Sequence, residues 1–323
     1  MKERNLAIEF LKFLAIFLVF NSHLESVYPI PSLATGGSIG NALFFFVSGF
    51  TLFRGRMDRF DVWYSRRIRR IFIPVFSWAV IAYVIFDTNT SINNFILLKG
   101  IWFLQAIMVY YVILYFIKKY FIKKHKLLFA IYFSTILIWN YIDLSLGSSM
   151  NAVYSLGASK ILQPYAMYFV FMLLGALIGD GIIIIKKSES LTKSLILLFV
   201  SVIVYYVYQY ICRIHTLSHL FVLIVPLLML IVLRFYDFAF LAIEKVKKIN
   251  WRYTQLLSAL CLEMYIVQTT IIHQFNFLPF PVNALVIILI TYVLAYITKL
   301  FSNLVTQVIS GKPFVLRELI KLF

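Results

Sequence analysis

The chain has 323 residues, of which 62% are hydrophobic and only 13% are charged, and its mean hydropathy is +0.91. A water-soluble domain of this size does not combine so much apolar with so little charged sequence. Apolar runs of about 18 residues recur along the whole chain, and each is a candidate membrane span. The short apolar and polar alternation of a membrane barrel is absent. We therefore expect an all-α, polytopic integral membrane protein.

The apolar runs predict about ten transmembrane helices in one domain that covers residues 1–323. We find no internal repeat, no linker to a second domain and no fused extra-membrane domain. The expected spans are residues 6–23, 41–53, 71–86, 100–117, 127–146, 164–185, 194–212, 217–233, 254–275 and 282–305.

The formal net charge of +17 does not indicate a nucleic-acid partner, because the basic residues form short clusters between the apolar runs. With ten spans, 25 of the 30 Lys and Arg residues fall on one side, and only Lys99, Lys160 and Arg213 fall on the other. By the positive-inside rule both termini are cytoplasmic, which agrees with an even number of spans. Topology and contacts with anionic membrane lipids account for most of the charge.

The first expected span carries three ionisable residues, Glu9, Lys12 and His23. At about 100° per residue they lie near one face of a helix, with Lys12 and His23 within about 20° of each other. Charged groups inside a membrane are costly and mark functional sites by default, and a histidine can move a proton near neutral pH. In the alternative interpretation, Glu9 and Lys12 neutralise each other and His23 only caps the helix.

Two further stretches contain residues that membrane topology alone does not explain. Ser48 and Gly49 follow three phenylalanines in the second span, and such small residues admit either a neighbouring helix or a ligand chain close to the backbone. Four arginines occur within five residues after the second span: Arg66, Arg67, Arg69 and Arg70. Guanidinium groups match phosphate in bidentate geometry, so this cluster, expected in a loop, suits a phosphorylated cytoplasmic ligand. Anchoring to anionic lipid head groups is the alternative.

Polar residues in later spans complete the candidate site. Trp102 opens the fourth span, and Glu263, Tyr265 and Gln268 lie in the ninth. We expect Glu263 to pair with Lys12; the alternatives are that it is protonated or that it holds a water in the site. The spacing of His215 and His219 is compatible with a metal, but no third ligand is evident, so we expect no metal site.

Five stretches together resemble the acyltransferase type 3 family of bacterial integral membrane O-acyltransferases. The resemblance covers nearly the full chain, and the stretches follow one another in the same order as in that family. They are Glu9–Lys12 with His23, Leu43–Phe50, Arg66–Pro74, Ile101–Leu104 and Leu262–Gln268.

The resemblance implies a multi-pass enzyme of the bacterial cytoplasmic membrane. Such enzymes transfer an acyl group, usually acetyl, from cytoplasmic acetyl-CoA or another acyl-CoA to a hydroxyl of a surface polysaccharide or lipid-linked glycan. It further implies that His23 is catalytic, that Lys12 is an essential basic residue, and that the arginine cluster binds CoA. We expect no fused hydrolase-like domain, so that the membrane domain itself reaches the acceptor.

The remaining site residues are assigned by extension of this resemblance. Glu9 joins Lys12 and His23 in the catalytic group, Ser48 and Gly49 line the path of the thioester arm, and the four later residues Trp102, Glu263, Tyr265 and Gln268 line the site. The chain departs from the family pattern at Lys12, where many members have arginine, and at Gln268, where many have histidine.

A glycan exporter or flippase is the competing interpretation, because buried charges within many helices also suit transport. Matched broken helices in two halves of the chain would favour it. The prolines Pro74, Pro164, Pro226 and Pro279 show no such matched spacing.

Overall fold

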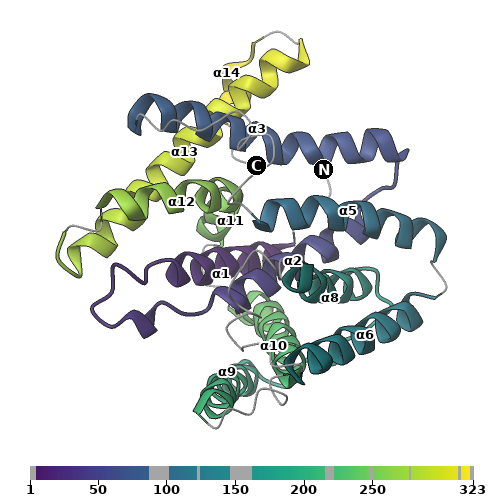
Figure 1. The fold of residues 1–323 in the computed structure, drawn as a ribbon. Coiled ribbons are helices and arrows are strands. Elements are labelled where there is room, and N and C mark those ends of the chain that lie inside the picture. The colour runs from purple at the N-terminus through teal and green to yellow at the C-terminus, as the bar shows by residue number, and fades with distance from the viewer. Residues whose placement is uncertain are drawn as a thin grey trace. The chain divides into compact units, whose positions relative to one another are not determined.

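The computed structural model describes residues 5–86, 102–121, 124–145, 162–214, 222–246, 251–275, 278–311 and 314–320. Within these ranges every regular element is a helix (Figure 1), as the long apolar runs predict. A helix satisfies its own backbone hydrogen bonds, which is the condition for crossing lipid. The all-α expectation is confirmed.

The chain divides into two compact units that alternate along the sequence. Unit one comprises Met1–Leu11, Asn41–Arg56 and Tyr110–Ile249, and unit two comprises Lys12–Gly40, Met57–Val109 and Asn250–Phe323. Because each unit draws on three separate stretches, no single position in the sequence separates them.

Six helices of the described chain are long and apolar enough to cross a membrane, and a bent pair raises the number to seven. This agrees with a polytopic membrane protein. The total of ten spans and the side on which the termini lie remain predictions. The candidate spans are Pro31–Arg54, Phe60–Phe86, Trp102–Tyr120, Leu191–Cys212, Ile224–Lys245 and Val282–Ser310, and the bent pair is Tyr253–Ala259 with Cys261–Ile272.

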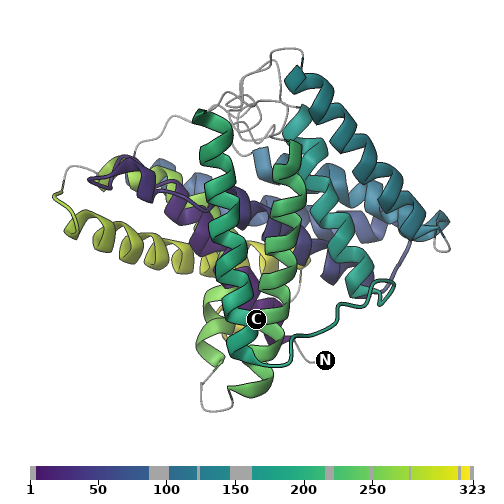
Figure 2. The same ribbon diagram turned by 90° about the horizontal axis from the view of Figure 1, so that it is seen from below.

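Unit one is built around the pairs α9 with α10 and α6 with α8. Figure 2 shows α9 and α10 side by side, and Asp237 of α10 joins them. Its buried carboxylate accepts hydrogen bonds from the Ser188 amide at 3.0 Å and hydroxyl at 2.6 Å and from the Ser194 hydroxyl at 2.7 Å. The bounds are α6 His125–Ser145, α8 Leu162–Gly179, α9 Leu191–Ile214 and α10 Ile224–Lys245.

Three helices belong partly to each unit. They are α1 (Leu6–Ser22), α2 (Gly37–Arg54) and α5 (Trp102–Tyr120).

Unit two is organised around α3, α12 and α13, which contact one another in all three combinations (Figure 1). A bend of 63° separates α11 from α12, so together they form one interrupted apolar segment. The bounds are η1 Pro31–Leu33, α3 Phe60–Phe86, α11 Arg252–Ala259, α12 Cys261–Phe275, α13 Val282–Ser310 and α14 Leu316–Leu319.

The arginine cluster lies within α3 and not in a loop, so the expected start of this helix at residue 71 is wrong. The helix begins at Phe60. Arginine is a good helix former, and Asp61 in the first turn favours the helix start through its interaction with the helix dipole. With 27 residues the helix is about 40 Å long, longer than the roughly 30 Å hydrocarbon core. Its arginine-rich first turns can therefore extend beyond the lipid.

Candidate functional site

His23 lies beside a cavity of about 330 Å³ in unit two. The cavity is lined by His23, Glu25 and Ser26 from the chain that follows α1, and by Thr269 and Ile272 from α12. Four of these five side chains are polar. The cavity thus joins the candidate catalytic histidine to hydrogen-bonding groups that the sequence analysis did not select.

The segment that carries Glu25 and Ser26 is fixed on both sides. Leu24 and Val27 are buried, with 2% and 4% of their surface exposed, so the two residues between them face outward. The Tyr28 hydroxyl donates to Asn21 Oδ1 at 2.6 Å, and Asn283 Nδ2 donates to the Val27 carbonyl at 3.2 Å. This anchoring to α1 and α13 holds the backbone of the segment beside the histidine.

The His23 ring is open to solvent on one side and partly desolvated on the other. It follows the last residue of α1, so it lies outside the helix. Partial burial disfavours the charged imidazolium and lowers the pKa of His23 below its ordinary value of 6.5. The ring is therefore neutral at physiological pH, which is the state that accepts a proton.

Glu9 and Lys12 lie one turn apart in α1, deeper in the helix than His23. Glu9 is buried with 6% exposure, and Lys12 is half-buried. The Lys12 carbonyl accepts a hydrogen bond from Cys261 Sγ at 3.5 Å, which ties this turn to the start of α12. Eleven residues of helical rise separate Lys12 from His23 by about 16 Å, so the two side chains can act only on different parts of a substrate.

Glu263 of α12 is paired with Lys299 of α13. The distance from Lys299 Nζ to Glu263 Oε1 is 3.0 Å, and the Glu263 side chain is only 1% exposed. The expected partner was Lys12, and the structure gives Lys299 in its place. The signal was present in the sequence, since Lys299 is a lone cation in the last expected span and Glu263 a lone anion in the one before it.

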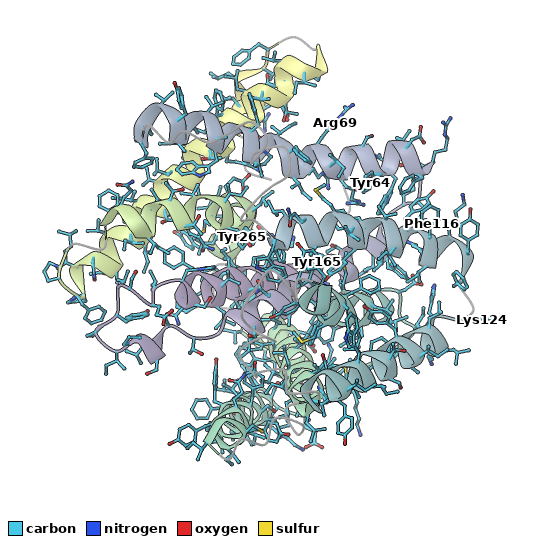
Figure 3. All side chains as sticks on the ribbon, viewed as in Figure 1. Tyr64, Arg69, Phe116, Lys124, Tyr165 and Tyr265 are labelled. Carbon is cyan, nitrogen blue, oxygen red and sulfur yellow. The ribbon has the colours of Figure 1, made fainter. Side chains whose placement is uncertain are left out.

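Two sequence motifs far apart in the chain meet through aromatic side chains. Phe103 lies beside Tyr265, labelled in Figure 3, with 5.2 Å between ring centroids, and its other neighbour is Trp102 at 6.2 Å. Gln268, one turn beyond Tyr265, is fully buried, and its amide atoms have no hydrogen-bond partner among the described residues. Three of the predicted site-lining residues thus lie on α12, and Phe103 links the fourth, Trp102, to them.

The four arginines of α3 fall into two groups. Arg66, Arg69 and Arg70 are exposed, and their spacing of three and four residues puts them on one face of the helix. Arg67 instead stacks over Trp63, with the guanidinium carbon 4.8 Å from the ring centroid. Arg66 pairs with Asp58. In the described part of the chain no ion pair engages Arg69, which projects outward in Figure 3, or Arg70.

Gly49 is a point of contact between α2 and α8. A Cβ atom at Gly49 would overlap the Met172 carbonyl, and one at Gly175 of α8 would overlap the Phe46 carbonyl in the same way. This reciprocal contact favours helix packing as the role of Gly49. Ser48, beside it, is half-buried.

Some predicted features lie outside the described residues. His215 and His219, the pair with metal-compatible spacing, are two of them, and Ile101 of the fourth-span motif is another. Within the described chain no three His, Cys, Asp or Glu side chains come together as metal ligands.

Long apolar helices, with an ionisable face on α1 and a buried ion pair between α12 and α13, define a multi-pass helical membrane protein. A family model described as an acyltransferase domain, that of the acyltransferase 3 family, matches residues 5–300. The chain therefore belongs to the acyltransferase 3 family and is a membrane acyltransferase. Neither a curated protein nor a solved structure matches it significantly.

Proposed function

We propose that this protein transfers an acyl group, acetyl in the first instance, from cytoplasmic acetyl-CoA or another acyl-CoA to a hydroxyl of a surface polysaccharide or lipid-linked glycan. The bacterial cytoplasmic membrane is the proposed location. Family membership supports acyl transfer. The observation that carries the proposal is the neutral His23 in the wall of a cavity that it shares with other hydrogen-bonding side chains, because such a group can activate an acceptor hydroxyl.

The proposed chemistry is one acyl transfer that balances without a further reactant. His23 takes the proton of the acceptor hydroxyl as its oxygen attacks the thioester carbonyl. The carbon–sulfur bond breaks, an ester forms, and the proton passes to the departing CoA thiolate. Lys12, about 16 Å deeper by helical rise, stabilises negative charge on the donor, and Glu9 lies one turn away from it in the same helix.

Arg69 and Arg70 are the proposed contacts for the CoA phosphates. They are exposed on the arginine-rich end of α3, and no described acidic residue neutralises them. Arg66 shares their face but is engaged by Asp58, and Arg67 is held over Trp63, so these two contribute less. Ser48 remains a proposed neighbour of the thioester arm, whereas the contact of Gly49 with α8 leaves that glycine a packing role.

The bent α11–α12 pair is the one observation that favours an exporter, since broken helices form the substrate sites of many transporters. A second broken pair in a corresponding position would strengthen that alternative. None occurs in the part of the chain that the structure describes.

The test is CoA release from acetyl-CoA by purified protein in nanodiscs, with isolated surface glycan as acceptor. His23→Ala should lower the rate by at least about a hundredfold, the scale of general base catalysis. The double variant Arg69→Ala with Arg70→Ala should raise the KM for acetyl-CoA. Arg59→Ala is the matched control, because Arg59 is an exposed arginine nearby that pairs with Asp61. A wild-type rate for His23→Ala would contradict the catalytic role.

A further inference from the structure

The cavity at the end of α1 has unused hydrogen-bonding capacity. Glu25, Ser26 and Thr269 are exposed and lie in its wall beside His23, and none of the four has a side-chain hydrogen bond within the described chain. A hollow with a mostly apolar wall and a few convergent polar groups is the usual form of a site for a small ligand. The position next to His23 suggests that the ligand is the molecule on which this histidine acts.

The composition of the cavity wall matches a sugar ring. A carboxylate accepts hydrogen bonds from two neighbouring hydroxyls, whereas serine and threonine both donate and accept. Buried Ile272 supplies the apolar surface on which the carbon face of a ring can rest. The volume of about 330 Å³ is at the small end of the usual range for ligand sites, which suits one sugar unit and not a longer segment.

Glu25 also makes the cavity selective by charge. Among the described residues no lysine or arginine lines the cavity, so none of them offsets the charge of the Glu25 carboxylate there. An anionic ligand in this space would meet the like charge of Glu25, which no described cation of the cavity wall offsets, whereas a neutral or aminated sugar would not. The same argument separates this cavity from the phosphates of CoA, which the arginines of α3 suit instead.

We infer that Glu25, Ser26 and Thr269 form the acceptor subsite, and that the acyl-accepting unit is a neutral or amino sugar rather than a uronic acid or a phosphorylated sugar. The identification as an acceptor subsite rests on the proposed function, whereas preferential sugar binding does not. Glu25 is thus a specificity-determining residue, and Ser26 and Thr269 orient the ring so that one hydroxyl faces His23.

The first experiment measures binding alone, in nanodiscs without donor. The probes are methyl glucoside, glucosamine and glucuronic acid, and binding is followed by saturation-transfer NMR. We expect the uronic acid to bind about tenfold more weakly than the other two. Glu25→Gln, which keeps the size of the side chain, should bring the three sugars to within about threefold. Thr269→Val should weaken all three alike. Glu189→Gln, at an exposed glutamate paired with Lys193, is the control and should change nothing.

The second experiment measures CoA release with the same sugars. Glu25→Gln should raise the KM for glucosamine and leave the KM for acetyl-CoA unchanged. The subsite is overturned if Glu25→Gln retains the wild-type order of sugar binding, or if the wild-type protein binds the uronic acid as tightly as the others. Selective, Glu25-dependent binding without CoA release would support a sugar subsite and contradict the proposed acyl transfer, so the two failures are distinguishable.

Discussion

Removing Lys299 should destabilise the protein more than removing Glu263, although the two residues form one ion pair. The Glu263 side chain is 1% exposed and that of Lys299 is 23% exposed, with 3.0 Å between Nζ and Oε1. At that distance, and with an effective dielectric constant of about 20, the attraction is about 5.5 kcal/mol. Lys299→Met leaves a buried carboxylate alone, which costs about 3–5 kcal/mol.

Glu263→Leu leaves a lysine that can extend toward the surface, so we expect a smaller loss of about 1–2 kcal/mol. The double variant should lie within about 1 kcal/mol of wild type, because an apolar pair replaces the ionic one. Thermal unfolding in detergent measures these differences, at roughly 2 °C per kcal/mol for a chain of this size.

An exposed ion pair provides the matched control for this experiment. Lys193 and Glu189 are also 3.0 Å apart, but their side chains are 54% and 83% exposed. Lys193→Met should change stability by no more than about 0.5 kcal/mol, because water screens this pair. The reasoning would be refuted if Glu263→Leu and Lys299→Met lowered the free energy of unfolding equally and the double variant lost the sum of the two.

Two further predictions concern α2 and His23. Gly49→Ala should lower the free energy of unfolding by about 1–3 kcal/mol, because the added methyl group meets the Met172 carbonyl. Ser48→Ala is the control and should change it by no more than about 0.5 kcal/mol. Equal melting temperatures for the two variants would contradict the contact between α2 and α8. The pKa of His23 lies below 6.5, so its neutral form persists as the pH falls to that value, and the rate of acetyl transfer should decline only below about pH 6.5. A rate that already falls between pH 8 and 7 would show that a different group controls the reaction.

The sequence predicted which segments are helices better than it predicted the residues at which those helices begin and end. Long apolar runs fix a helical membrane protein, because a helix is the one open structure that pairs all its backbone groups within lipid. The predicted start of α3, at residue 71, is eleven residues too late. A charge cluster marks where a span leaves the lipid, but the helix itself can continue beyond that point. Arginine continues a helix readily once the chain has left the lipid.

The sequence related candidate site residues to one another where they share one helix. Glu9 and Lys12 lie in α1, and His23 follows its last turn, so helical periodicity alone related them. Family resemblance supplied their proposed roles, which stay predictions, whereas the family itself is established by the match over residues 5–300. Glu25 and Ser26 were missed because a short polar connection after a span has no periodic pattern from which to select them.

By itself, the sequence determined the class of protein and the ionisable face of its first helix. These follow from composition and from spacing within single helices, which are local properties of the chain. Only the tertiary structure decided that Glu263 pairs with Lys299, that Gly49 meets α8 and that Thr269 joins His23 at one cavity. Each of these contacts joins residues from different helices or loops. For each residue the chain offers many other residues that could form the same kind of contact. Which of them meet depends on how the helices pack.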